Sequence, residues 1–325
     1  MSILNITGFS GIAGRIILVI GTVLHAFTGA VAAPFAYVTN EGSGSISVID
    51  TETDALAGQI VTGGKPRGLA LSPGADLLYV SEQAGNRLLT IDTKTLKIIK
   101  ISPTGKSPEA VYASADGNLI AIANEESNDV SLLDARSQTL LAAIAVRGRN
   151  PEHPVFSPNS KRIFVSAEET DKIDVLDVES RKQVGQIDVG QRPRGIGFTP
   201  DGKTAVVACE LEDTVYFIDV DSNRVRGKLK TGLRANGVVI HPRGDIAFIS
   251  HGGDADVAFV DIASMRVLAR VPVGKRPWNM GITPDGAKLY VANGRSQSVT
   301  VVDVAKAAVI RDISVGALPW GVVVR

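Results

Sequence analysis

Ile46-Ser47-Val48-Ile49-Asp50 is the first of seven short apolar segments that end in an aspartate. These aspartates are Asp50, Asp92, Asp134, Asp177, Asp219, Asp261 and Asp303, and successive ones lie 42, 42, 43, 42, 42 and 42 residues apart. A sequence period in this range is typical of one small β-unit repeated around a ring. Residues that recur in all seven units therefore belong to the scaffold. Residues that vary at equivalent positions can carry function.

Each unit predicts four strands, which we call A to D in chain order. Strand A follows a Gly-x-x-Pro element, a turn such as Thr199-Pro200-Asp201-Gly202 leads to strand B, strand C ends in the repeat aspartate, and strand D returns to the next Gly-x-x-Pro. Apolar residues on both faces of strand C indicate a sheet that is covered on both sides. We expect each repeat aspartate to accept backbone N–H groups two residues on and so to fix the C–D turn.

The two ends of the repeat region predict how the ring closes. The first unit opens with a strand B, Tyr37-Val38-Thr39-Asn40, and the chain stops after a strand A, Pro319-Trp320-Gly321-Val322-Val323-Val324-Arg325. Seven complete units exist only if the C-terminal strand completes the first blade, which also removes exposed sheet edges. The fold class is therefore predicted as all-β, a seven-bladed β-propeller of four-stranded blades. An open solenoid would need capping repeats.

Residues 1–32 differ from the rest of the chain. Arg15 precedes an apolar run from Ile16 to Val23, and Ala30-Val31-Ala32 fits the small-x-small pattern of a signal cleavage site. We predict a secretory signal over 1–32, a single propeller domain over 33–325, and a periplasmic or secreted protein. The alternative is an uncleaved membrane anchor, for which the run from Ile16 to Ala33 is of borderline length. Cys209 is the only cysteine, so no internal disulfide can form.

Charge and motif content exclude several functions. The chain has 34 basic and 34 acidic residues, and Arg15 is the only one of them within 1–32, so the remainder carries a net charge of −1. A nucleic-acid partner would require a basic excess. The sequence holds no haem-attachment, zinc, phosphate-loop, dinucleotide or nucleophile-elbow motif. We expect no cofactor, no metal ion and no catalytic group. His241 is interpreted as a solvated turn residue, and His153 and His251 as polar loop residues.

The loops from D to A and from B to C should emerge on one face, at the mouth of the central channel. After the proline of each Gly-x-x-Pro, or its equivalent Ala235, come Trp320, Arg67, Glu109, Glu152, Arg194, Asn236 and Trp278 in ring order. Just before it come Leu318, Lys65, Ser107, Asn150, Arg192, Arg234 and Arg276. The set is lopsided, with two neighbouring tryptophans flanked by basic residues and with two glutamates across the channel.

Tryptophan and arginine are enriched at binding hot spots, and guanidinium groups beside an aromatic pair suit a planar anion or an acidic protein surface. We therefore predict a ligand- or partner-binding site formed by Trp278, Trp320, Arg67, Arg192, Arg194, Arg234, Arg276, Asn236, Glu109, Glu152 and Lys65. The alternative is that the arginines stack on tryptophan only to fill the channel mouth. Acidic residues of the B–C loops, including Glu82, Glu168 and Glu210, are interpreted as a solvated outer rim.

Several segments carry a resemblance to a known family. Tyr37-Val38-Thr39-Asn40, its echoes Tyr79-Val80-Ser81 and Tyr290-Val291-Ala292-Asn293, and the Gly-Gln-Arg-Pro-Arg-Gly element at 190–195 resemble the YVTN β-propeller repeat family over residues 34–325. The segment from Asn124 to Val130 and the terminal segment from Pro319 are similar to a bacterial subgroup of secreted propellers. The members of that subgroup are encoded beside alcohol-oxidation systems that use pyrroloquinoline quinone (PQQ).

The resemblance implies a periplasmic, non-catalytic accessory protein, which we expect to be a monomer. Its partner would be a quinoprotein dehydrogenase, a cytochrome c or a transport component, unless the ligand is a small anion. The family also resembles propeller lactonases, from which no catalytic residue set carries over. A lactone hydrolase with Glu109 or Glu152 as base and Arg194 or His153 as electrophilic aid is the first alternative. A purely structural envelope protein is the second.

Overall fold

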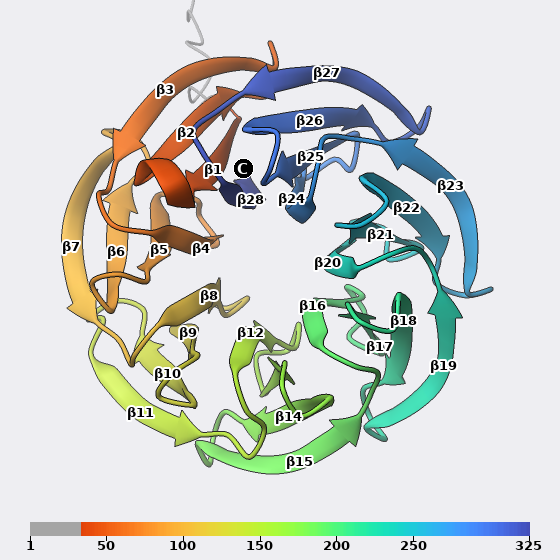
Figure 1. Ribbon diagram of the computed structural model, residues 1–325. Helices are drawn as coiled ribbons and strands as arrows, with labels where there is room; N and C mark the ends of the chain where they lie inside the picture. Colours follow the sequence, from red (N-terminus) through yellow and green to blue (C-terminus); the bar gives the residue numbers. More distant parts are fainter. Residues whose placement is uncertain (1–33) are drawn as a thin grey trace, which may run out of the picture. The chain divides into compact units, whose positions relative to one another are not determined.

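The computed structural model describes residues 34–325, which form seven four-stranded antiparallel sheets around one central channel (Figure 1). The all-β, seven-bladed propeller predicted from the sequence is confirmed. The predicted signal segment 1–32 lies outside the described residues. Within residues 34–325, the one short helical turn is η1 (Glu41–Ser43), and no helix is long and apolar enough to cross a membrane.

The strands take the same place in every blade. The innermost A strands are β28 (Pro319–Val324), β4 (Pro66–Leu71), β8 (Pro108–Ala113), β12 (Pro151–Phe156), β16 (Pro193–Phe198), β20 (Ala235–Ile240) and β24 (Pro277–Ile282). The B strands are β1 (Phe35–Asn40), β5 (Leu77–Glu82), β9 (Leu119–Asn124), β13 (Arg162–Ala167), β17 (Thr204–Cys209), β21 (Ile246–His251) and β25 (Lys288–Asn293).

The two outer strands of each blade follow the same order. The C strands are β2 (Ser45–Asp50), β6 (Arg87–Asp92), β10 (Asp129–Asp134), β14 (Lys172–Asp177), β18 (Thr214–Asp219), β22 (Asp256–Asp261) and β26 (Ser298–Asp303). The D strands, which form the outer wall in Figure 1, are β3 (Ala55–Val61), β7 (Lys97–Pro103), β11 (Leu140–Ala145), β15 (Lys182–Asp188), β19 (Arg224–Lys230), β23 (Arg266–Pro272) and β27 (Ala308–Ser314).

The C-terminal strand closes the ring. β28 pairs antiparallel with β1, with Val324 opposite Ala36 and Val322 opposite Val38, and the first sheet has the order β28-β1-β2-β3. A side-chain contact ties the last blade to the first, because the Tyr290 hydroxyl and the Lys288 ammonium both donate to the carboxylate of Asp54. Closure therefore joins residues more than 230 positions apart in the sequence, as the incomplete units at the two ends of the repeat region predicted.

The B and C strands supply most of the apolar core, which lies between the faces of adjacent blades. Phe217, Phe248 and Phe164 are among the largest fully buried side chains, and each packs in a cluster that spans two blades. The A strands approach one another so closely that most have a small third residue. A Cβ on Gly237 would lie 2.3 Å from the carbonyl oxygen of Trp278, so only glycine fits there.

A hydroxyl from strand B fastens neighbouring A strands at three of the seven blade junctions. Oγ of Ser250 accepts from the N–H of Gly237 at 2.8 Å and donates to the carbonyl of Trp278, in the next blade, at 2.5 Å. Ser81 and Thr39 make the same pair of bonds at their own junctions. These bonds satisfy backbone groups that the irregular A–B pairing leaves free, because each A strand bulges after its first residue.

The repeat aspartates are structural, but their bonding differs in one detail from the expectation. In all seven blades the carboxylate accepts the backbone N–H of the third residue on, for example Ser264 bonding to Asp261 at 2.7 Å. At Asp50 and Asp92 the carboxylate accepts the N–H of the second residue on as well. The fourth residue after each aspartate has a positive φ, as Met265 does after Asp261. The bond from the N–H of the third residue closes this turn.

Candidate functional site

One face of the ring carries both the D–A loops and the B–C loops, as the sequence predicted. In every blade the first residue after strand B donates its N–H to the carbonyl of the residue before the A-strand proline or its equivalent, at 2.9–3.1 Å. The seven donors are Glu41, Gln83, Glu125, Glu168, Glu210, Gly252 and Gly294. This bond places the first residue after strand B beside the second residue of strand A. These two positions of all seven blades, together with the residue before each A-strand proline, form a charged ring that we call the channel mouth.

Glu210 is the most constrained charge of the channel mouth. Its side chain is 0% exposed, and four guanidinium groups lie within ion-pair distance of it: Arg276 at 2.7 Å, Arg194 at 3.0 Å, Arg234 at 3.3 Å and Arg192 at 3.5 Å. We call these five residues the Glu210 cluster. Burial alone would raise the pKa of Glu210, but the positive charges of Arg194 and Arg276 lower it to about 2. The carboxylate therefore stays ionised and holds the arginines in place.

The glutamates predicted to lie across the channel are each paired with an arginine of an adjacent blade. Glu109 accepts from Arg67, and Glu152 accepts from Arg194. Glu109 and Glu152 are buried, so neither is a free acidic group facing the channel.

The interpretation of the B–C loop acids as a solvated rim is wrong for Glu82, Glu168 and Glu210, which are all buried. Glu82 bonds the backbone N–H groups of Lys65, Ala84 and Gly85 and the guanidinium of Arg87, which is a structural role.

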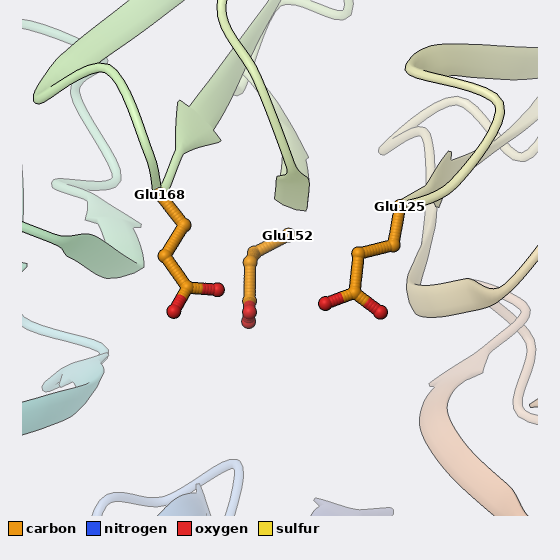
Figure 2. A group of neighbouring side chains, drawn as sticks. All are labelled: Glu125, Glu152 and Glu168. Carbon is orange, nitrogen blue, oxygen red and sulfur yellow. The ribbon is translucent and has the colours of Figure 1, made fainter.

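Three further carboxyl groups gather on one side of the channel mouth, and we call Glu125, Glu152 and Glu168 the glutamate trio. Figure 2 shows their carboxyl groups turned toward a common space, and oxygen atoms of the three lie within 4.8 Å of one another. Each carboxyl already has a donor: Ser107 for Glu125, Arg194 for Glu152, and Asn150 and Arg192 for Glu168. Carboxylates so placed suit a hard cation such as Ca²⁺. Here two arginines already supply positive charge.

Glu168, at the channel mouth, has a pKa near neutrality. Burial and the neighbouring Glu152 carboxyl raise its pKa to about 7, against the lowering effect of Arg194 and Arg192. Glu168 is therefore partly protonated near neutral pH. A carboxyl with a pKa near the working pH can act as a general base.

The two tryptophans lie on adjacent A strands, but their rings face different surroundings. Trp320 reaches into the channel and stacks on His153 of β12, with ring centroids 5.9 Å apart and ring planes 10° apart. Trp278 lies against Gly294, where a Cβ would be 2.8 Å from its ring. The described residues show no ring contact between the two. The aromatic pair expected from the sequence is therefore one half-buried mouth residue and one buried channel residue.

All three histidines of the described region lie in buried surroundings, which corrects their interpretation as solvated turn or loop residues. His153 belongs to strand β12, and its Nδ1 is 3.0 Å from the hydroxyl of Tyr112. Burial, and to a lesser degree the charge of Arg194, lower the pKa of His153 to about 3, so its ring is neutral. His241 is buried as well, and its Nδ1 accepts the N–H of Arg243.

His251 resembles part of a catalytic triad without being one. Its Nδ1 is 2.6 Å from Asp256 and its Nε2 is 3.0 Å from the hydroxyl of Thr231. Thr231 and His251 are almost completely buried, so a substrate cannot reach the hydroxyl. Asn40, Asn124 and Asn293 occupy the place of His251 in other blades and bond strand C hydroxyls there. The arrangement therefore stabilises the blade.

The remaining predicted site residues lie at the channel mouth but take no part in the Glu210 cluster. Lys65 is exposed, Asn236 is buried, and neither side chain has an ion-pair or hydrogen-bond partner among the described residues. Arg67 bridges Glu41 and Glu109 in neighbouring blades. The residues that sequence reasoning missed are Glu125, Glu168 and Glu210. Their common position directly after strand B could have singled them out.

Comparisons with known proteins agree with this architecture. Residues 152–310, just under half of the chain, match the sequence profile of a family described as lactonase, 7-bladed beta-propeller. The matched segment includes Glu152, Glu168 and the whole Glu210 cluster. No curated protein sequence matches the chain.

Two solved structures share the fold. The chain is similar to Kuenenia stuttgartiensis hydrazine synthase, with a TM-score of 0.74 and 24% identity over 79% of this chain and 89% of that one. It is also similar to a functionally unknown protein from Desulfotomaculum acetoxidans DSM 771, with a TM-score of 0.79 and 16% identity over 89% of this chain and 98% of that one. At such identities the likeness concerns the fold alone.

Proposed function

We propose that the chain is an exported binding protein whose ligand, a small planar carboxylate, occupies the channel mouth at the Glu210 cluster. The observation that carries the proposal is the concentration of four arginines on one buried carboxylate. The four arginines face the three carboxylates of Glu210, Glu152 and Glu168, and an oxygen of Glu125 lies within 4.8 Å of the last two as a fourth acid. Because Glu168 has a pKa of about 7, a surplus of positive charge develops as the pH falls below neutrality.

The arrangement leaves room for a second carboxylate. The side chain of Arg234 is 49% exposed although it pairs with Glu210, whereas that of Arg276 is 16% exposed. A guanidinium group offers five N–H donors, and the contact with Glu210 uses only part of them. Arg276 lies against Gly252, and Trp278 is half-buried against Gly294 of the next blade, where its ring offers a flat apolar surface at the same channel mouth. Together they match a ligand with a carboxylate attached to a planar body.

The biological setting of this proposal comes from the resemblance to secreted YVTN-type propellers. In that setting the protein would be a periplasmic accessory of a PQQ-dependent oxidation system, and the bound carboxylate would be an oxidation product or its carrier-bound form. A pulldown from periplasmic extract tests the setting, with Arg234→Gln/Trp278→Ala as the matched variant. Recovery of a quinoprotein or cytochrome by the wild type alone supports it, and identical lanes argue against it.

A second candidate is hydrolysis of lactones, and two observations favour it. Residues 152–310 match the lactonase profile, and Glu168 combines a pKa of about 7 with a neighbouring guanidinium group. Glu168 would accept a proton from the attacking water, and Arg194 would stabilise the developing oxyanion. Glu168 takes the place of Glu109 and Glu152 as the expected base because its pKa is raised to about 7, although Arg192 and Arg194 pair with it as well.

The lactone candidate has its own test. Five- and six-membered lactones are incubated with the wild type and with Glu168→Gln, and ring opening is followed by proton release. Turnover that is lost in Glu168→Gln but kept in the surface variant Glu169→Gln would support an enzyme. Rates equal to the buffer background for every lactone would leave binding as the function.

A further inference from the structure

The central channel contains a second, apolar compartment on the far side of the channel mouth. A cavity of about 320 Å³ is lined by the A strands, chiefly by Leu69, Leu71, Val111, Met280, Ile282 and Val323. Trp320 and His153 form its wall toward the channel mouth, and no charged side chain lines it. We call this cavity the lower chamber. The stacked rings separate it from the arginines and glutamates of the mouth.

The lower chamber is reached from the face that carries the A–B turns. Apart from Trp320, its lining residues occupy the third to sixth positions of the A strands, and those nearest the turns, such as Leu71, Ile282 and Val324, are only partly buried. Val239, on β20, also lines the space; it is half-buried and packs against the core cluster that contains Met280. A ligand can therefore enter without passing the Trp320–His153 stack.

Three polar groups face this apolar space. Oη of Tyr112 and Nδ1 of His153 are 3.0 Å apart, which leaves Nε2 of His153 without a hydrogen-bond partner among the described residues. Asn279 lines the chamber, and its carboxamide has no hydrogen-bond partner in the part of the chain that the structure describes. An apolar pocket with a few convergent polar groups is the usual form of a small-molecule site.

We infer that the lower chamber is a second ligand site, which binds an uncharged aromatic or alicyclic molecule that carries one hydroxyl or carbonyl group. The volume is roughly twice that of the 150 Å³ apolar cavity known to hold benzene, so the ligand has about 12 non-hydrogen atoms. Its ring packs against Trp320, and its polar group bonds Asn279 or His153. A charged ligand is disfavoured because no opposite charge lines the chamber and the His153 ring is neutral.

The inference is independent of the carboxylate site, since the two sites share only the stacked rings between them. The probe is 1-naphthol, which has 11 non-hydrogen atoms, and its charged counterpart is 2-naphthoate. Isothermal titration calorimetry of the full propeller measures both. We expect saturable 1:1 binding of 1-naphthol at concentrations up to about 1 mM. Because 2-naphthoate can also bind the Glu210 cluster, its affinity for the lower chamber is read from its displacement of 1-naphthol, which should require at least a tenfold higher concentration than the binding of 1-naphthol itself.

Two variants and a control define the location. Val239→Phe fills the chamber and should abolish 1-naphthol binding, and Asn279→Leu should weaken it by about two- to tenfold through loss of one hydrogen bond. Arg224→Gln, on the outer strand β19, should change nothing. If Val239→Phe does not fold, Asn279→Leu still decides the matter. Wild type without saturable binding, or Val239→Phe and Asn279→Leu with unchanged affinity, would overturn the inference, as would loss of binding in Arg276→Gln alone.

Discussion

Nη2 of Arg276 donates to Oε1 of Glu210 at 2.7 Å, which joins two blades across 66 residues of sequence. The same carboxylate also contacts arginines from β16 and from the loops that precede β16 and β20. One buried side chain thus fixes the position of four guanidinium groups at the channel mouth. Its removal has consequences for stability as well as for binding.

We expect Glu210→Gln to destabilise the protein by about 3 kcal/mol, because four arginines would lose the charge that holds them together. Urea unfolding followed by circular dichroism measures the change. The matched control is Glu169→Gln, whose pair with Arg149 is largely exposed and contributes less than about 1 kcal/mol. Equal stability of Glu210→Gln and wild type would show that the cluster is not an energetic unit.

Acid should weaken the same contact. The pKa of Glu210 is lowered to about 2 in the folded protein, whereas the unfolded chain has a value near 4.3. Its stabilisation is therefore present above about pH 4.3 and is lost as the pH falls toward 2. Over this window wild type should lose on the order of 3 kcal/mol more than Glu210→Gln, measured by thermal unfolding at pH steps. Parallel curves for the two proteins would contradict the assignment.

Glu168 should affect the pH dependence of stability in the opposite direction to Glu210. Its pKa of about 7 in the folded state exceeds the unfolded value, so the folded protein binds more protons between about pH 4.3 and 7. Stability from this group is complete below that window and falls as the pH rises through 7. Glu168→Gln should match wild type near pH 4 and be more stable by about 1–3 kcal/mol at pH 8. A variant less stable than wild type at pH 8 would refute the raised pKa.

Closure by the C-terminal strand predicts a severe effect of truncation. Deletion of Pro319–Arg325 removes β28, exposes the inner edge of β1 and takes away the Trp320 ring that divides the channel. We expect the truncated chain to lose its cooperative thermal transition and to aggregate, because an unpaired edge is open to association. Size-exclusion chromatography and circular dichroism test this. A monomer that melts within a few degrees of wild type would show that the ring closes by other contacts.

The sequence predicted the scaffold because the scaffold is what repeats. Seven aspartates at a 42-residue period required seven copies of one unit, and the incomplete units at the two ends required their joining. The 42-residue period also predicts some contacts of the site. Arg67 and Glu109, and likewise Glu152 and Arg194, lie one period apart, so opposite charges at that offset predict ion pairs between neighbouring blades.

Other parts of the site could not be read from the period. The contact between Arg276 and Glu210 depends on how far two long side chains reach over the channel mouth, which the spacing does not specify. His153 is recognisable in the sequence, because it stands where five other blades carry glycine or alanine. A large residue at a position of close backbone approach must turn into the channel, and there it meets Trp320.

The central claim, a carboxylate site at the Glu210 cluster, is tested most directly by titrating benzoate into wild type, Arg234→Gln and Arg224→Gln in a calorimeter at pH 7 and low salt. We predict 1:1 binding to wild type and to Arg224→Gln, at least tenfold weaker binding to Arg234→Gln, and loss of affinity as salt is added. Benzoate that fails to bind wild type, or that binds Arg234→Gln equally well, would contradict it.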